Sequence, residues 1–194
     1  MKKIIAVLVV TILVLAGCGT ATDGDTQKVG VAMPTKSAQR WIQDGDNLKS
    51  QLEEKGYEVD LQYAQDDTSV QASQIENMIT QGVDCLVVAS VDGTALTEPL
   101  QQAQDAGIPV ISYDRLLMNT DAVSYYITFD NYQVGALQAQ YIIDTLGLDL
   151  NDTSKTYNME IFAGSLSDNN ATFFYNGAMD TIHPYIDAVF INVA

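Results

Sequence analysis

Apolar positions recur along this chain with two alternating periods, which predict strands that alternate with helices. Short apolar or β-branched runs predict strands, and longer segments with apolar residues three or four positions apart predict helices. The predicted strands are residues 28–33, 57–64, 85–89, 109–113, 122–129, 157–163 and 188–193. The predicted helices are residues 39–55, 70–81, 94–106, 131–146 and 169–182. Repeated strand–helix units with short connections predict an α/β fold, a parallel sheet with helices on both faces.

The first residues do not follow this rhythm. Two lysines precede an uncharged apolar stretch, residues 4–16, which is short for a bilayer span of about 20 residues and is typical of a signal peptide. The tetrad Leu15-Ala16-Gly17-Cys18 resembles the lipobox of bacterial lipoproteins, which implies removal of residues 1–17 and a lipid on Cys18. An ordinary secretory signal with an incidental cysteine is the alternative. The small, polar residues 18–27 predict a flexible tether.

The composition excludes some partners. The formal net charge is −16, and it becomes −18 without Lys2 and Lys3. Such an acidic surface is a poor partner for nucleic acid. Only two cysteines occur, so a lipid on Cys18 leaves Cys85 without an intramolecular disulfide partner; its apolar surroundings predict a buried structural thiol.

The strand pattern also predicts a boundary between two units. Five strands precede Asp130, and about 100 residues is a usual domain size. We therefore expect an N-terminal lobe over residues 28–129 and a second unit over residues 130–194, which the resemblance described below implies is a partial second lobe. In the last strand of the first lobe, alternation predicts that Tyr125 and Tyr126 divide between core and surface.

Polar residues follow the predicted strands, and parallel strands bring their carboxyl ends to one edge of the sheet. The residues at these ends are Arg40 and Trp41, Asp92, Asp114 and Arg115, Asp130 and Asn131, and Asp168, Asn169 and Asn170. The buried strand that ends in Asp114-Arg115 is the clearest case. A carboxylate beside a guanidinium at this edge predicts a clamp for a polyol or an anion.

The residue types favour a sugar over a simple anion. Vicinal hydroxyls pair well with Asp, Asn and Arg, and the C–H face of a sugar packs on an aromatic ring, for which Trp41 is the only tryptophan. Asp114 and Asp168 would repel an anion but accept protons from hydroxyl groups. A core role for Trp41, and helix-cap roles for Asp168 and Asn169, remain alternatives.

Enzyme chemistry finds little support. His183 is the sole histidine and precedes Pro184, which predicts a surface position near a helix end. No catalytic triad or glycine-rich phosphate loop can be assembled, and no Cys/His spacing fits a metal. We therefore expect no enzyme activity, no cofactor and no metal.

Several segments together resemble the xylose-binding branch of sugar-binding receptors for bacterial ABC importers. They are Arg40-Trp41, residues 73–79, Tyr113-Asp-Arg115, Phe129-Asp-Asn131 and residues 164–171. The resemblance implies a type I periplasmic binding protein with two Rossmann-like lobes that close on a monosaccharide, a pentose or hexose, and deliver it to a membrane permease. By position it implies sugar contacts from Arg40, Trp41, Asp114, Arg115, and Asn169 or Asn170. Residues 35–39 depart from the more charged loop of xylose-binding members, which leaves the sugar open.

Such receptors are longer than this chain, so the resemblance implies an N-terminal lobe with an incomplete second lobe, from a truncated or fragmentary coding sequence. With the signal peptide it implies an extracytoplasmic location, lipid-anchored to the outer face of the cell membrane or periplasmic. Two other functions share this architecture. One is a receptor for a chemoreceptor or signalling partner, and the other is the effector domain of a sugar-responsive regulator. Cys18 and the lack of an N-terminal helix-turn-helix disfavour the regulator.

Overall fold

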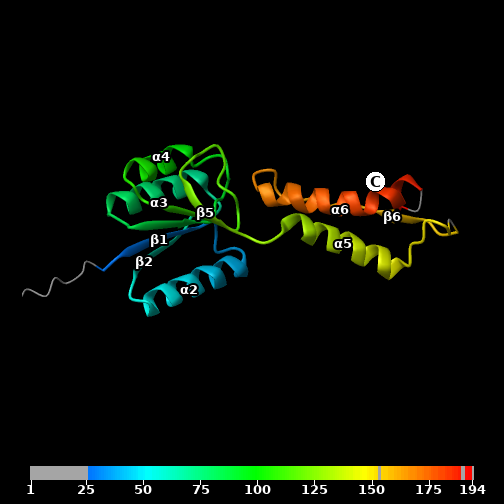
Figure 1. Cartoon of the computed structure of the whole chain (residues 1–194), viewed down its shortest axis with the longest axis horizontal. Coiled ribbons are helices and arrows are strands. Elements are labelled where there is room, and N and C mark those ends of the chain that lie inside the picture. The colour runs from blue at the N-terminus through cyan, green and yellow to red at the C-terminus, as the bar shows by residue number, and fades with distance from the viewer. Residues whose placement is uncertain (1–25, 153, 189–190, 194) are drawn as a thin grey trace, which may run out of the picture.

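The computed structural model describes residues 26–152, 154–188 and 191–193. They form two parts that are joined by a linker (Figure 1): a sheet with helices on both faces, and a smaller part built on two long helices. The predicted signal peptide, Cys18 and most of the predicted tether lie outside the described residues. Within the described ranges, none of the helices combines the length and apolar character needed to cross a membrane.

The first part is a five-stranded parallel sheet with the order β2-β1-β3-β4-β5. The strands are β1 Lys28–Met33, β2 Glu58–Tyr63, β3 Cys85–Val88, β4 Val110–Tyr113 and β5 Val123–Ile127. The helices are α2 Gln39–Glu54, α3 Thr68–Thr80 and α4 Thr97–Asp105. Helices α3 and α4 cover one face and α2 covers the other (Figure 1). The predicted α/β class with a parallel sheet is confirmed.

The two faces of the sheet bury different cores. Ile75, Leu86 and Leu100 are fully buried between the sheet and helices α3 and α4. Met33 of β1 and Trp41 of α2 belong to the core on the other face, between the sheet and α2. Because the central strand β3 is covered on both faces, its residues are apolar without alternation, as the sequence pattern indicated.

Side-chain hydrogen bonds of two aspartates act near the starts of α3 and α4. Asp67 caps α3 by accepting hydrogen bonds from the backbone amides of Ser69 and Val70, at 2.8 and 3.1 Å. Helix α4 begins three residues later than predicted. The Asp92 carboxylate accepts hydrogen bonds from the amide and the hydroxyl of Thr94, which stabilise a turn where the sequence pattern predicted helix.

The second part contains α5 Asn131–Leu146, α6 Asn169–Asp187, and a two-stranded parallel sheet of β6 Tyr157–Met159 and β7 Ile191–Val193. Strand β6 is shorter than predicted because residues 160–163 have no strand to pair with in the described ranges. Helix α6 is longer than predicted and continues through Pro184, and the amide of Ala188 donates to the Pro184 carbonyl at 3.1 Å. His183 is exposed, as predicted, and pairs with Asp187 at 3.1 Å.

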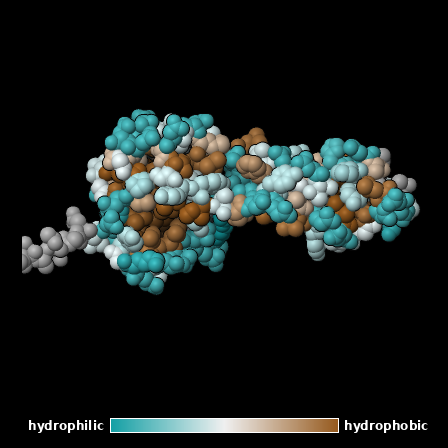
Figure 2. Space-filling view, in the orientation of Figure 1, coloured by the Kyte–Doolittle hydropathy of each residue, from teal (hydrophilic) through white to brown (hydrophobic). Residues whose placement is uncertain are grey.

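Strand β5 lies at the edge of the sheet. Tyr125 and Tyr126 are 68% and 39% exposed, so the predicted division between core and surface is wrong. The reason is that alternation places a side chain in a core only where another layer covers that face, and neither face of β5 is well covered at these positions. Figure 2 shows hydrophilic surface over α2 and α4, and apolar surface between these helices and on parts of α5 and α6.

Helices α5 and α6 approach so closely that only glycine fits at their contact. A Cβ atom at Gly135 would lie 2.0 Å from the Phe174 carbonyl oxygen, and one at Gly177 would lie 2.0 Å from that of Tyr132. The small apolar core of this part, with Ile143 and Ile182, depends on this close contact.

We therefore expect Gly135→Ala to destabilise the second part by about 1–3 kcal/mol, because the added methyl group forces the helices apart. Urea unfolding followed by circular dichroism measures this change. Gln133→Ala on an exposed position of the same helix is the control and should change stability by less than about 0.5 kcal/mol. Equal stability of the two variants would contradict the packing described for these helices.

Candidate functional site

The turn after β4 carries the centre of the candidate site. Asp114 has a φ of 61°, in the left-handed region that Asp tolerates better than most residues. The fully buried hydroxyl of Ser112 holds the turn: it donates to the Arg115 carbonyl at 2.8 Å and accepts from the Leu117 amide at 3.0 Å. The side chains of Asp114 and Arg115 consequently lie at the carboxyl end of the sheet.

Arg40, in the first turn of α2, reaches across to Asp114. Its guanidinium forms a hydrogen-bonded ion pair with one oxygen of the Asp114 carboxylate and a longer pair with Asp44 at 3.3 Å. Burial lowers the pKa of Arg40, but the hydrogen bond and charge of Asp114, together with Asp44, outweigh it and raise the pKa above its ordinary value. The second oxygen of Asp114 makes no hydrogen bond among the described residues and is available as an acceptor.

Arg115 spans the first part and the start of α6. Its Nη1 donates to the Ser90 carbonyl at 2.9 Å, at the end of β3. Its Nε lies 3.0 Å from the carboxylate of Asp168, although the N–H does not point along this contact, so the two form an ion pair and not an aligned hydrogen bond. Arg115 therefore links one strand end to the other part of the molecule.

Trp41 forms the floor beneath the two arginines. The guanidinium carbons of Arg40 and Arg115 lie 4.4 and 5.2 Å from its ring centroid, which is cation–π geometry. Trp41 is only 5% exposed because its side chain also packs in the core between α2 and the sheet. Trp41 is thus a core residue, and its position beside both guanidiniums places it at the candidate site as well.

The predicted amides Asn169 and Asn170 lie at the start of α6. Asp168 caps this helix by accepting a hydrogen bond from the Asn170 amide at 3.0 Å. The Asn170 side chain is buried and donates to the Asp114 carbonyl at 2.9 Å. Asn169 is less buried, and its side chain makes no hydrogen bond within the described ranges. Residues 40, 41, 114 and 115 therefore meet the start of α6 in one polar cluster.

Several residues around this cluster were not predicted as site residues. Tyr126 and Thr128 donate to the Asp114 carbonyl, and Asn131 donates to Asn170. Gln71, fully buried on α3, donates to the Ala89 carbonyl and accepts from the Val91 amide, which fixes the loop after β3. Asn131 is among the polar residues at the predicted strand ends but was not predicted to contact the sugar. Gln71 has no such signal, since it lies within a helical pattern.

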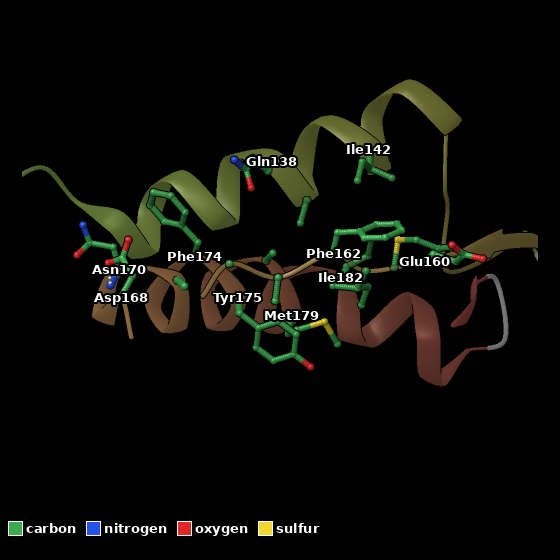
Figure 3. A pocket seen from close by; sticks show the side chains of 17 residues that line it. Gln138, Ile142, Glu160, Phe162, Asp168, Asn170, Phe174, Tyr175, Met179 and Ile182 are labelled. Atoms are coloured by element: carbon green, nitrogen blue, oxygen red, sulfur yellow. Dashed lines mark hydrogen bonds between the residues drawn. The ribbon is translucent and has the colours of Figure 1, made fainter. Parts of the chain in front are cut away.

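A cavity in the second part of the molecule is a different feature (Figure 3). It has a volume of about 450 Å³ and runs between α5, α6 and residues 159–164, with apolar side chains such as Ile142, Phe162 and Met179 along it. Of the polar cluster, only Asp168 and Asn170 line one end of it. Its apolar lining does not suit a polyol, so the polar cluster is the better candidate site.

Two other kinds of site, a reactive cysteine and a metal centre, find no support in the described residues. Burial and the neighbouring charge of Asp84 raise the pKa of the Cys85 thiol above its ordinary value, which disfavours the reactive thiolate. In the part of the chain that the structure describes, no group of three or more His, Cys, Asp or Glu side chains could hold a metal ion.

Comparison with known proteins gives consistent results. A family model described as "Periplasmic binding protein domain" matches residues 29–192. The multiple sugar-binding periplasmic protein SbpA of Azospirillum brasilense is 52% identical over 185 residues, which cover 95% of this chain and 51% of that protein. The D-xylose-binding periplasmic protein of Escherichia coli K12 is 37% identical over 166 residues, 86% of this chain and 48% of that protein.

A solved structure agrees with the fold. The ABC transporter solute binding protein of Clostridium phytofermentans with bound β-D-glucose superposes with a TM-score of 0.83 at 56% identity, covering 86% of this chain and 51% of that chain. This chain thus spans about half the length of the relatives it matches. These matches confirm the predicted resemblance to sugar-binding receptors of ABC importers. With its parallel α/β sheet and a family match over nearly all the described residues, the chain belongs to the periplasmic binding protein domain family.

Proposed function

We propose that this chain captures a monosaccharide, xylose or a related pentose or hexose, for an ABC transporter. The observation that carries this proposal is the Asp114 carboxylate, held by Arg40 at the end of β4 and flanked by Arg115 above the Trp41 ring. A protein named for binding multiple sugars and one named for D-xylose are among the relatives, and a similar solved structure holds glucose. The family and these relatives support a binding protein and not an enzyme.

The electrostatics of the cluster favour neutral hydroxyl groups. Two guanidiniums are balanced by the carboxylates of Asp114, Asp44 and Asp168, so little positive charge is left for an anion. A sugar hydroxyl can donate to the free oxygen of Asp114 and accept from a guanidinium, which is the bidentate pattern that vicinal hydroxyls offer. We propose Asn169 and Asn170 as further sugar contacts at the start of α6.

We also propose that the protein is held outside the cytoplasm by a lipid on Cys18, after removal of residues 1–17. The proposed sugar-binding lobe, residues 28–129, would then be tethered by residues 18–27 at the outer face of the membrane or in the periplasm, near a permease. Residues 130–194 form part of a second lobe in this proposal. The motivation is the lipobox-like Leu15-Ala16-Gly17-Cys18.

The sugar proposal predicts heat on titration with at least one sugar of a pentose and hexose panel. Asp114→Asn should weaken binding of that sugar by about 10- to 100-fold, because a charged acceptor is lost beside Arg40. Asp105→Asn, the same change on the exposed end of α4, is the matched control and should leave the affinity unchanged. No heat with any sugar, or equal affinities of the two variants, would contradict the proposal.

The anchor proposal predicts that cells expressing the chain incorporate labelled palmitate into it. Cys18→Ser should abolish this labelling, because the acylated thiol is lost. Cys85→Ser changes the only other cysteine and should retain the label. Labelling that persists in Cys18→Ser would contradict the anchor proposal and would leave the sugar-binding proposal untouched.

A further inference from the structure

Three donors converge on one backbone oxygen of the candidate site. The Asp114 carbonyl lies 3.2 Å from the Tyr126 hydroxyl, 3.1 Å from the Thr128 hydroxyl and 2.9 Å from Nδ2 of Asn170. A carbonyl has two lone pairs, so three donors saturate it. Asp114 has the left-handed φ of 61°, a backbone state that persists in a non-glycine residue where its surroundings hold it.

A second convergence fixes the amide of Asn170. Nδ2 of Asn131 lies 3.2 Å from each of three acceptors, namely the Thr128 hydroxyl, the Phe129 carbonyl and Oδ1 of Asn170. The Tyr126 hydroxyl lies 3.4 Å from the same Oδ1. Because Nδ2 of Asn131 donates to its oxygen, Asn170 turns its NH₂ group toward the Asp114 carbonyl, and the single proton of the Tyr126 hydroxyl is shared between that carbonyl and Oδ1 of Asn170. Asn131 and Asn170 are only 6% and 5% exposed, so little water competes for these bonds.

These contacts surround the linker between the two parts of the molecule. Residues 128–130 connect β5 to α5, and the chain crosses from one part to the other there (Figure 1). Tyr126 lies in β5 and Asp114 directly follows β4, while Asn131 is the first residue of α5 and Asn170 is the second residue of α6. A rotation of the parts about the linker would separate Asn170 from Asp114 and break the network.

We propose that Tyr126, Thr128 and Asn131 form a linker latch, a set of positioning residues that orient Asp114 and Asn170 for a common sugar. The inference rests on the proposed function, since it assigns residues that act through the sugar contacts without being required to touch the sugar. The latch stabilises the arrangement of the two parts in which the Asp114 carbonyl and the Asn170 amide meet, which reduces the ordering cost of binding.

Tyr126→Phe is the sharpest test, because it removes one hydroxyl from a ring that is 39% exposed and so carries little risk to folding. Tyr125→Phe is the matched control on the adjacent, more exposed tyrosine. Hydrogen exchange of the Asp114 and Arg115 amides in sugar-free protein should be faster in Tyr126→Phe and unchanged in Tyr125→Phe. Affinity for the sugar bound by the unaltered chain should fall about two- to tenfold in Tyr126→Phe alone.

Asn131→Asp provides a second variant of the same shape. It replaces the NH₂ group by an oxygen facing the Phe129 carbonyl and Oδ1 of Asn170, so it should lower sugar affinity by more than tenfold. The exposed Asn151→Asp is its control. Melting curves monitored by circular dichroism identify a variant that fails to fold, in which case Tyr126→Phe decides.

The outcomes separate the latch from the proposed function. Equal amide exchange in Tyr126→Phe and the unaltered chain would overturn the latch, whether or not a sugar binds. Faster exchange with unchanged sugar affinity would also overturn it, because the network would then be structural only. If no sugar binds the unaltered chain, the proposed function falls, while amide exchange still reports whether the latch holds Asp114.

Discussion

The arrangement of the candidate site depends on the conformation of Asp114. Its backbone turns left-handed directly after β4, its carboxylate pairs with Arg40, and its carbonyl accepts bonds from both parts of the molecule. If this residue were extended, as the strand before it is, the side chain would leave Arg40 and the carbonyl would leave Asn170. The backbone conformation of Asp114 thus determines both the ion pair with Arg40 and the hydrogen bond to Asn170 that connects the two parts.

Paired carboxylates explain how this acidic protein can hold both of its arginines close together in the clamp, the cluster of Arg40, Asp114 and Arg115 beside Trp41. The chain has a formal net charge of −16 and contains only two arginines, both of which lie over Trp41. Each guanidinium is kept in place by a carboxylate, Arg40 by Asp114 and Arg115 by Asp168. The cost of burying these charges is offset by pairing, and the donors that remain are suited to hydroxyl groups.

Much of the fold followed from periodicity, since buried parallel strands and amphipathic helices have distinct patterns. The positions of Arg40, Trp41, Asp114 and Arg115 followed from the rule that parallel strands end at one edge. Features that depend on tertiary contacts were not predictable in this way. The exposure of Tyr125 and Tyr126 depends on which layers cover β5, and the buried role of Gln71 depends on a loop distant in sequence.

Because Arg40 and Arg115 are the only two arginines of the chain, their NMR signals can be assigned to the clamp, and they give the most direct test of sugar binding there. In a nitrogen-15 NMR titration, the Nε–H signals of Arg40 and Arg115 report the clamp alone. If the clamp binds sugar, D-xylose or D-glucose should shift both signals along saturable curves with one shared dissociation constant, and a sugar alcohol that cannot form a ring should have a weaker effect. Signals that stay fixed at every concentration of every monosaccharide tested would contradict sugar binding at Asp114.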